Sequence, residues 1–388
     1  VVFFDGPGGT QVPQPVVDAM SHYLLTYNSN IEGEYSLTRE TDEMIASARE
    51  YAGAFVGGDG DYIAFGQNTT TLNFNLATAM ARTLAPGDEI VVTRLDHDAN
   101  VAPWLLVAKD HGLVVKTVGL THDLLIDLDD LKSQLTPRTK VVAFSLASNA
   151  VGTLSPARHI ADLAHEVGAL AWVDAVAYAA HHRISVAELG CDVLLSSPYK
   201  YFGPHLGLAW IRPGLAESLP GNRVRPAGET PPGHRFETGT LSHEALAGFI
   251  AAVEYIASLG EHRTLEGRLD AAFFWIERHE HELTEQFLSG ISEFPQLELV
   301  GPAVADQTLR SGTFGLRVVG GGSARLARAL GDAGIFTWNG SFYAQGVMEH
   351  LGLDLEEGLL RIGLTHYNTS EEVTRFFATL TRVLADAD

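Results

Sequence analysis

Between about residue 60 and residue 212, short apolar segments alternate with helical patterns, and no other feature constrains the fold as strongly. The apolar segments are rich in β-branched residues, and they are Tyr62–Phe65, Glu89–Thr93, Val114–Val118, Lys140–Leu146, Ala169–Val173, Asp192–Ser196 and Gly207–Ile211. Helical patterns such as Thr71–Leu84 and Ala157–Val167 lie between several of them. Continuous apolar strands separated by helices are typical of a mostly parallel sheet covered on both faces. We therefore predict an α/β fold built on a mostly parallel, seven-stranded sheet.

The pattern changes after about residue 213. The stretch Pro213–His234 is rich in Pro and Gly and predicts an irregular excursion. We expect a helix from Ser242 to about Leu259 and a longer amphipathic helix through Phe287. Later elements are strands near Leu297–Val300, Thr313–Val319 and Leu359–Leu364 and a last helix at Ser370–Ala385. We predict a large domain of residues 16–258 and a smaller α+β domain of residues 259–388, with segment 1–15 packed against it.

The composition excludes several classes of protein. The net charge of −22 argues against nucleic acid as a partner, because phosphate backbones are bound by basic patches. The single cysteine, Cys191, rules out an intramolecular disulfide and a multi-cysteine metal site, and its apolar neighbours predict a buried structural thiol. No apolar stretch is long enough to cross a bilayer and no leader-like segment opens the chain. We expect no membrane association and, by default, a cytoplasmic location.

Polar segments follow the predicted strands at the points where the strands end. They are Gly66–Thr70, Asp96–Asp98, Ser148-Asn149, Asp174 and Ser196–Lys200. Ligands of parallel α/β sheets bind at the carboxyl ends of the strands, where loops carry the polar residues. We therefore expect these segments to form one site.

Two charged residues of this set stand in apolar surroundings. Lys200 lies just beyond an apolar strand, and in a partly desolvated site the pKa of its ammonium would fall, leaving an amine that can attack an aldehyde. A lysine that extends from a strand end to solvent is the alternative. Asp174 ends the strand Ala169–Val173, where a carboxylate needs a cation such as a protonated pyridine nitrogen. A carboxylate that caps a neighbouring helix is the alternative.

Two further segments indicate anion binding and ring stacking. Gly66–Asn73 follows a strand and opens a helix, so its N–H groups and hydroxyls predict an anion site, although a simple Asn/Thr helix cap explains it equally well. It lacks the pattern of a P-loop or a dinucleotide fingerprint. His97 can stack on an aromatic ring or act as an acid or base, or it is incidental to a capping loop. No matching cluster at metal-ligand spacing accompanies it, so we predict no metal site.

Ordered matches along nearly the whole chain resemble the class V aminotransferase family of pyridoxal phosphate enzymes, and in particular its cysteine desulfurase-like branch. The matching segments are Phe4–Thr10, Ala99–Trp104, Ser148–Thr153, Val173–Ala175, Lys200, Phe236–Thr240, Leu360–Leu364 and Tyr367-Asn368. The resemblance implies fold type I of these enzymes and pyridoxal 5'-phosphate as the cofactor.

The resemblance also implies a role for each candidate residue. Lys200 would carry the cofactor as a Schiff base, and Lys200, His97 and Asp174 would form the catalytic set. His97 would stack on the pyridine ring, Asp174 would pair with its nitrogen, and Asn149 would lie near the ring hydroxyl. The phosphate would be held by Asn68, Thr69 and Ser197.

Other matches concern the substrate and a second subunit. Arg361 matches the arginine that grips the α-carboxylate of the substrate in a two-pronged salt bridge. Gly239 and Thr240 match the segment that reaches the phosphate from the partner subunit, which implies a homodimer with shared active sites.

Four positions depart from the desulfurase pattern. Tyr343 stands where a mobile loop of desulfurases presents the nucleophilic cysteine, and a persulfide cannot form on tyrosine. Trp338 replaces an arginine that assists substrate binding, and we expect Trp338 and Tyr343 to contact the substrate. Tyr199 replaces a histidine, as in kynureninases, and its phenol would bind phosphate instead. Ala177 replaces a glutamine near the ring hydroxyl, a position that Tyr178 beside it could serve.

We therefore expect an enzyme that acts at Cα or Cβ of an amino-acid substrate through Lys200. Cleavage of a C–S or other β-bond without a cysteine nucleophile is the leading hypothesis. An aminotransferase or an epimerase resembling isopenicillin N epimerase is the alternative. The competing non-enzymatic hypothesis is a degenerate fold-type-I protein that serves as a binding subunit.

Overall fold

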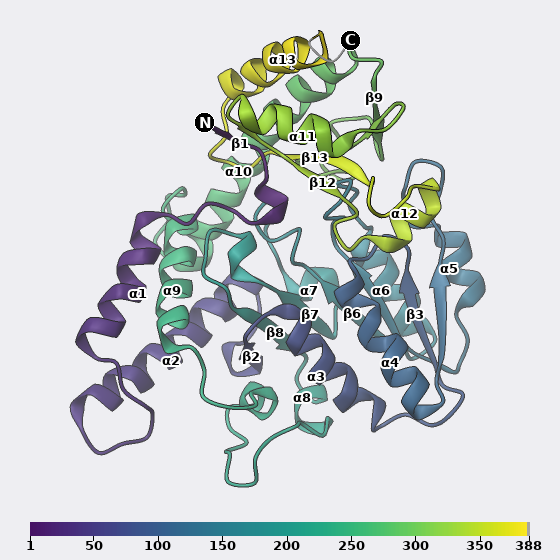
Figure 1. The fold of residues 1–388 in the computed structure, drawn as a ribbon. Coiled ribbons are helices and arrows are strands. Elements are labelled where there is room, and N and C mark those ends of the chain that lie inside the picture. The colour runs from purple at the N-terminus through teal and green to yellow at the C-terminus, as the bar shows by residue number, and fades with distance from the viewer. Residues whose placement is uncertain (386–388) are drawn as a thin grey trace.

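The computed structural model describes residues 1–385 and has a central seven-stranded sheet (Figure 1). In spatial order its strands are β2 (Ile63–Gly66), β8 (Gly207–Ile211), β7 (Val193–Ser196), β6 (Leu170–Asp174), β5 (Thr139–Ser145), β3 (Glu89–Thr93) and β4 (Val114–Val118). Only β8 runs against its two neighbours. The predicted mostly parallel α/β sheet is therefore confirmed, and the predicted strand limits agree with the observed ones to within one residue.

Successive residues of a central strand pack into two different hydrophobic cores, one on each face of the sheet. In β5, Val142 and Phe144 join the core beneath one face of the sheet, and Val141 and Ala143 join the core on the other face. Successive side chains of a strand point to opposite faces, so a strand buried on both sides needs an uninterrupted apolar run. This explains why the strands lack a polar–apolar alternation.

Helices cover both faces of this sheet (Figure 1). The connecting helices are α3 (Thr69–Ala81), α4 (Ala102–His111), α5 (Leu128–Gln134), α6 (Ala157–Glu166) and α7 (Val186–Leu189), and a short helix α8 (Leu215–Ser218) follows β8. At one side, α1 (Gln14–Thr26), α2 (Ser36–Val56) and α9 (His243–Ala257) pack together. The sequence analysis predicted α9 but did not predict α1 or α2.

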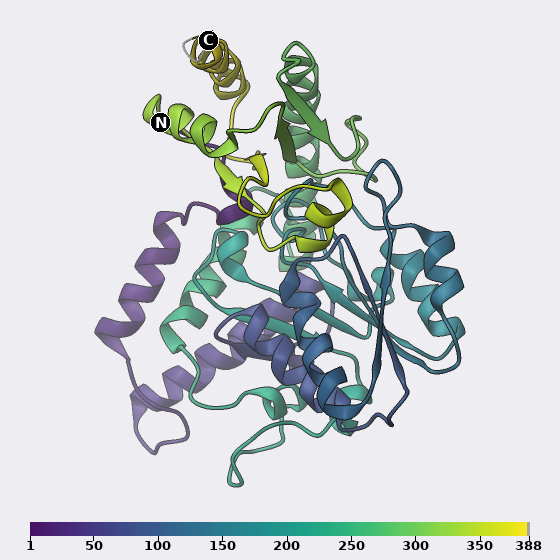
Figure 2. The same ribbon diagram turned by 45° about the vertical axis from the view of Figure 1, so that its right-hand side comes forward.

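The C-terminal part forms a smaller sheet with helices on it. Its strand order is β12 (Trp338–Gly340), β13 (Leu359–Gly363), β10 (Thr313–Val318) and β9 (Leu297–Val300), and its helices are α10 (Leu265–Ile291), α11 (Ser323–Asp332), α12 (Gln345–Leu351) and α13 (Ser370–Ala385). Strand β1 (Val2–Phe3) pairs in parallel with β11 (Ile335–Phe336). Figure 2 shows these elements standing on one end of the large sheet. The predicted domain limits stay a prediction, and residues 386–388 of the predicted small domain lie outside the described residues.

Within residues 1–385, no helix is long and apolar enough to cross a membrane.

Candidate active site

A cleft of about 580 Å³ opens at the carboxyl ends of the parallel strands of the large sheet. It is lined by Asn68, Thr69, Thr70, His97, Ala99, Ser145, Ala147, Asn149, Asp174, Val176, Ala177, Ser197, Tyr199 and Lys200. All the residues predicted to bind the cofactor line this cleft except Gly239 and Thr240. The segments that the strand-end rule singled out therefore lie together in one cleft.

One end of the cleft is built to receive an anion. Asn68 caps α3, because its Oδ1 accepts a hydrogen bond of 2.8 Å from the N–H of Thr71. The buried hydroxyls of Thr69 and Ser197 lie 2.8 Å apart, and the N–H of Thr69 donates to Ser197 Oγ at 3.2 Å. The backbone of Asn68 lies so close to Gly207 that an added Cβ would stand 2.5 Å from it. A helix N-terminus with two hydroxyls fits a phosphate group.

The same cleft also holds a buried carboxyl group. Asp174 is 5% exposed at the end of β6, and its Oδ1 accepts a hydrogen bond of 2.8 Å from the N–H of Val176. Burial raises the pKa of Asp174 to about 7, and the nearby charge of Asp96 adds to the rise. A carboxyl group in this position gains most from a cationic donor such as a protonated pyridine nitrogen. Asp174 and the anion end therefore fit the two ends of pyridoxal phosphate.

His97 follows β3 and is held as a neutral imidazole. Its Nδ1 accepts a hydrogen bond of 3.0 Å from the N–H of Ala99, which leaves Nε2 to carry the proton. Burial, together with the charges of Lys200 and Arg361, lowers the pKa of His97 to about 4. A neutral ring suits stacking better than proton donation at neutral pH.

Asp96, which the sequence analysis placed among the polar segments of the site, organises the loop of His97. The buried carboxylate of Asp96 accepts hydrogen bonds from Ser145 Oγ at 2.7 Å, from Asn100 Nδ2 at 2.9 Å and from the hydroxyl of Thr93. Within the described residues, no group of three His, Cys, Asp or Glu side chains could hold a metal ion.

Lys200 extends from the short helix Pro198–Lys200 into the cleft. Its Nζ donates a hydrogen bond to the carbonyl oxygen of Pro7 and lies 4.9 Å from the centre of the Tyr199 ring. Burial and the charge of Arg361 lower the pKa of Lys200 to about 7, against the opposing charges of Asp5 and Asp174. A substantial fraction of this amine is therefore neutral, and hence nucleophilic, at neutral pH.

Arg361 lies in β13, and its guanidinium group is oriented by contacts with the N-terminal segment and with the loop after β5. Nη2 donates to Asp5 Oδ1 at 3.0 Å and Nη1 donates to the carbonyl oxygen of Asn149 at 3.1 Å. Nε has no hydrogen-bond partner among the described residues, although it is buried. The ring of Phe342 lies over the guanidinium, with 4.1 Å between Cζ and the ring centre. Arg361 thus retains a donor for a further carboxylate.

The segment around Phe342 and Tyr343 has a strained backbone. Both residues have positive φ angles, of 57° and 56°, which side chains other than glycine rarely adopt. Their carbonyl oxygens accept hydrogen bonds of 2.8 Å from Asn149 Nδ2 and from the N–H of Asp98, respectively. The strained segment is therefore held directly against the loops at the strand ends.

Tyr343 and Trp338, the two aromatic residues expected to contact the substrate, are both largely exposed. The Tyr343 side chain is 73% exposed, although its ring remains 5.4 Å from that of His97. Trp338, paired in register with Arg361, is 58% exposed. The substrate contacts of Tyr343 and Trp338 stay predictions, and it is Phe342, which the sequence analysis did not single out, that covers Arg361.

Tyr178, Gly239 and Thr240, which were expected near the cofactor, do not line the main cleft. Tyr178 does not line the cleft, because its ring stacks on His182 with 4.7 Å between ring centres, so it does not replace the glutamine missing at Ala177. Gly239 and Thr240 line a separate cleft of about 1260 Å³ together with Gln67 and His205. One chain alone therefore does not bring them to the cofactor-binding residues.

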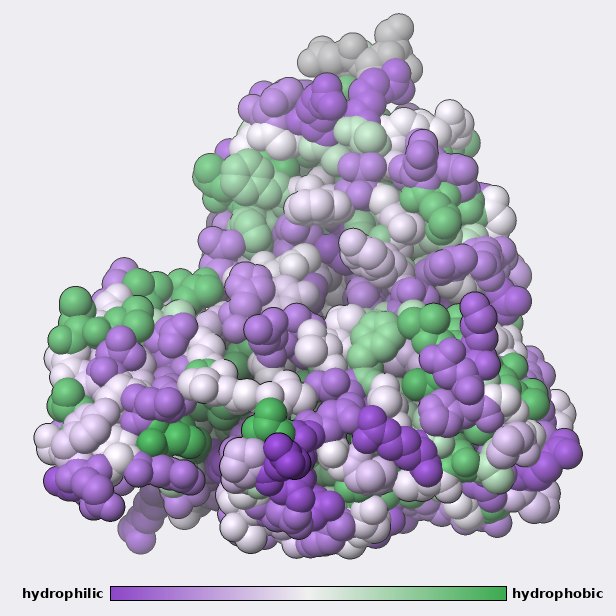
Figure 3. All heavy atoms as spheres, turned by 60° about the horizontal axis from the view of Figure 1, so that its bottom comes forward, coloured by the Kyte–Doolittle hydropathy of each residue, from purple (hydrophilic) through white to green (hydrophobic). Residues whose placement is uncertain are grey.

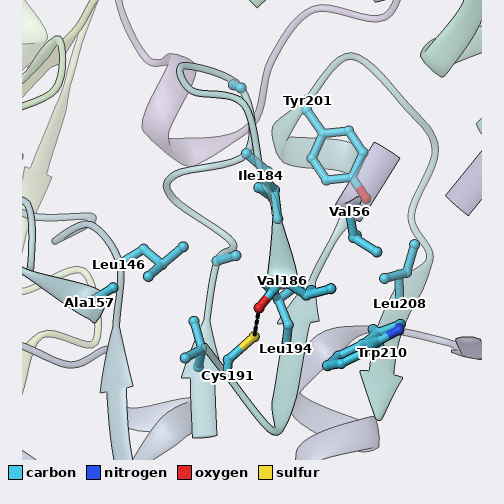
Figure 4. Close-up of a cluster of buried hydrophobic side chains, with 14 of the residues drawn as sticks. Val56, Leu146, Ala157, Ile184, Val186, Cys191, Leu194, Tyr201, Leu208 and Trp210 are labelled. Carbon is cyan, nitrogen blue, oxygen red and sulfur yellow. Dashed lines mark hydrogen bonds between the residues drawn. The ribbon is translucent and has the colours of Figure 1, made fainter. Parts of the chain in front are cut away.

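Cys191 is a buried structural thiol, as its sequence surroundings predicted (Figure 4). It packs among apolar side chains such as Val186 and Leu194, and its thiol lies 3.8 Å from the carbonyl oxygen of Val186. Burial raises the pKa of this thiol to about 12. Cys191 therefore has neither the access nor the ionisation of a nucleophile.

Comparisons with known proteins agree with this fold. The model of the family "Aminotransferase class-V" matches residues 2–376. An aminotransferase-like protein of Gibberella zeae is 32% identical over 99% of this chain and 94% of its own length. A cysteine desulfurase of Synechococcus elongatus is 31% identical over 99% of this chain, and a probable cysteine desulfurase of Mycolicibacterium paratuberculosis is 31% identical over the same share.

The chain spans only 60% and 55% of the length of those two desulfurases, respectively. Among solved structures, the apo cysteine desulfurase of Thermococcus onnurineus NA1 superposes with a TM-score of 0.89 at 26% identity, covering 100% of this chain and 95% of its own.

Proposed function

Because this chain belongs to the class V aminotransferase family, and is thus a pyridoxal phosphate-dependent enzyme of fold type I, we propose that it acts at Cα or Cβ of an amino acid through Lys200. The observation that carries the proposal is the convergence of Lys200, Asp174 and the Thr69–Ser197 hydroxyl pair on one cleft. Their separate chemistries match the aldehyde, the ring nitrogen and the phosphate of the cofactor.

Each end of the cofactor would be held by a different part of the cleft. The N-terminus of α3, with Asn68, Thr69 and Ser197, would hold the phosphate, and Tyr199 would add a phenol. Asp174 would hold the ring nitrogen in its protonated state. The bound cofactor supplies a sink for the electron pair left at Cα when a bond to Cα breaks.

Lys200 would then serve as the acid–base group. Its amine, with a pKa lowered to about 7 by burial and Arg361, can take the proton from Cα and return it at neutral pH. The neutral His97 would cover the ring and exclude water from it. Arg361 would hold the α-carboxylate of the substrate with Nε, for which Asp5 and Phe342 fix the orientation of the guanidinium.

The arrangement of cysteine and tyrosine favours a particular reaction. The curated bacterial relatives named cysteine desulfurases imply chemistry at a C–S bond, yet the single cysteine of this chain is buried. We therefore favour the loss of a β-substituent from the substrate without transfer of sulfur to the enzyme. Transamination and epimerisation, which use the same Lys200 chemistry, are the alternatives.

We also infer a homodimer. The face in Figure 3 shows apolar groups on the arm formed by α1 and α2, and the exposed apolar side chains there are Val17, Leu24, Leu25, Ile31, Tyr35 and Leu37. The cleft lined by Gly239 and Thr240 gives a partner access to the phosphate end. Light scattering should therefore give twice the chain mass of 41.8 kDa. The cytoplasmic location stays a prediction.

A panel of amino acids tests the proposed reaction. Loaded enzyme should release a keto acid, ammonia and the β-substituent from a β-substituted amino acid, for example pyruvate, ammonia and sulfide from cysteine, and Lys200→Ala should release none of them. Products are identified by mass spectrometry. A keto acid formed with stoichiometric conversion of the cofactor to its amine form would favour transamination, and inversion at Cα alone would favour epimerisation. Absence of any reaction across the panel by cofactor-loaded protein would contradict the proposal.

A further inference from the structure

A second, smaller cavity also borders Lys200, and its lining residues include Pro7, Ala177, His181, Lys200 and Thr313. The carbonyl oxygen of Pro7 accepts the hydrogen bond from Lys200 Nζ, so the amine already points toward this cavity. The cavity has room for about one water molecule. A water molecule in this cavity would link Lys200 to His181.

His181 forms a buried pair with Glu280 of α10. Both residues are 5% exposed, and His181 Nδ1 lies 2.7 Å from Glu280 Oε2. Because the two nitrogens of an imidazole lie on different edges of the ring, His181 uses Nδ1 for Glu280 and has Nε2 left for another partner. A histidine held in this way by a carboxylate can take a proton at one nitrogen and release one at the other.

Beyond Glu280 lies another cavity, which leads toward the surface. It encloses about 270 Å³ and is lined by His182, Glu277, Glu280, His281, Thr284, Ala305, Gln307, Arg310, Ser311 and Gly312. Three buried atoms there have no hydrogen-bond partner among the described residues, namely Glu280 Oε1, His182 Nε2 and His281 Nδ1. Buried polar groups are seldom left unpaired, so three around one cavity indicate that water enters it. The side chains of Glu277 and His281 are about one-third exposed and form its outer edge.

We propose that His181 and Glu280 form a proton path between Lys200 and solvent, which runs through these two cavities. This inference rests on the proposed role of Lys200 as the acid–base group. A proton released by the ammonium of Lys200 passes by water to His181 Nε2, while the proton on Nδ1 passes to Glu280. Glu280 then loses this proton to water in the outer cavity, which restores its carboxylate. The imidazole is left neutral in its other tautomer, and the reverse sequence returns a proton to Lys200.

The negative charge of Glu280 keeps the buried imidazole of His181 able to accept a proton. Burial on its own would lower the pKa of His181, but the charge of Glu280 and the hydrogen bond to it raise the pKa instead. The other titratable groups near the pair come from five segments of the chain, and they are Tyr178, His182, Glu277, His281, Lys200, Arg310, His366 and Tyr367. Arg310 donates only to carbonyl oxygens, so within the described residues Glu280 is not neutralised by it.

A purely structural role is the competing explanation, since the pair also ties the segment after β6 to α10. Two variants separate the roles. His181→Asn keeps a hydrogen bond to Glu280 but lacks Nε2, and His181→Asn combined with Glu280→Gln keeps the bond and removes the charge as well. His159→Asn, on the exposed surface of α6, is the matched control.

The first measurement uses the apoprotein and does not depend on the reaction. The chain has only five lysines, Lys109, Lys116, Lys132, Lys140 and Lys200, so reductive methylation with ¹³C-formaldehyde gives few signals, and the loss of one in Lys200→Arg assigns Lys200. His181→Asn keeps the negative charge of Glu280 and should leave the titration midpoint of Lys200 unchanged. The double variant removes that charge, so the midpoint should fall by about half a pH unit or more. An unchanged midpoint in the double variant would show that the pair does not face Lys200, and would overturn the proposal.

The second measurement follows exchange of the Cα proton of L-alanine for deuterium in ²H₂O by the cofactor-loaded enzyme. Both His181 variants should exchange several-fold more slowly than wild type and His159→Asn, at equal cofactor content and equal thermal stability. Exchange at the wild-type rate in the double variant would overturn the path while leaving the role of Lys200 intact. If Lys200→Ala exchanged as fast as wild type, the proposed function would fail instead, and the path with it.

Discussion

Arg361 Nη2 lies 3.0 Å from Asp5 Oδ1, so residues 356 positions apart in the chain form one buried ion pair beside the active site. This pair joins the N-terminal segment to β13 at the point where the substrate carboxylate is expected. It also places a negative charge near Lys200, whose pKa Asp5 helps to keep from falling further. The N-terminal segment is thus part of the site rather than an appendage.

We expect Asp5→Asn to lower the free energy of unfolding by about 1–3 kcal/mol, because it leaves a buried guanidinium without a counter-charge while keeping a hydrogen bond. Urea denaturation of the apoprotein measures the change. Asp18→Asn, at an exposed position of α1, should change the stability by less than about 0.5 kcal/mol. Equal effects of the two substitutions would show that the Asp5–Arg361 pair contributes no stability.

Arg361→Lys should weaken substrate binding without loss of cofactor. Lysine keeps the charge but lacks the planar guanidinium, so a carboxylate loses its hydrogen bond from Nε. The amino-acid concentration that half-saturates the spectral change of the cofactor should rise by about 10- to 100-fold, which corresponds to about 1.4–2.8 kcal/mol. The absorbance of the bound cofactor before addition of substrate should match wild type. An unchanged half-saturation would refute the carboxylate-binding role.

Phe342 and Tyr343 offer a matched pair of substitutions in one loop. Phe342→Ala removes the ring that covers Arg361 at 4.1 Å and should raise the half-saturating amino-acid concentration several-fold, because a desolvated cation–π contact contributes about 1–2 kcal/mol. Tyr343→Ala removes an exposed side chain and should have a smaller effect. The opposite order would favour the substrate contact that the sequence predicted for Tyr343.

The rate at which the apoprotein captures pyridoxal phosphate should depend on pH through Lys200. Only the neutral amine attacks the aldehyde, so the rate constant should rise as pH increases and level off above about 7, where the pKa of Lys200 lies. Stopped-flow absorbance follows the capture. An ordinary lysine would give a rate that still rises up to about pH 10, and that result would contradict the lowered pKa.

Much of the site could be predicted because it follows from local sequence. Asp174 and Lys200 each come directly after an apolar strand, and parallel strands deliver their carboxyl ends to one edge of the sheet. The Asn68 cap likewise needs only the residues that open α3. Helices α1 and α2 were missed because their outward faces expose apolar residues such as Leu24, Leu25 and Leu37, which obscures the usual periodicity.

The remaining features depend on long-range contacts or on backbone conformation. Nothing in the sequence joins Asp5 to Arg361, or His181 to Glu280 across 99 positions. The positive φ angles at Phe342 and Tyr343 decide which ring covers Arg361, and no periodic pattern reports them. Sequence reasoning therefore identified the loop but did not single out Phe342, whose ring covers Arg361.

Borohydride trapping tests the central claim most directly. Cofactor-loaded protein is reduced, digested and analysed by mass spectrometry, and the partly buried Lys116, which is bound to Glu89, serves as an internal control among the five lysines. We predict a pyridoxyl phosphate adduct on the peptide that contains Lys200, none on the Lys116 peptide, and no adduct in Lys200→Ala. An adduct spread over several lysines, or one that persists in Lys200→Ala, would contradict the account.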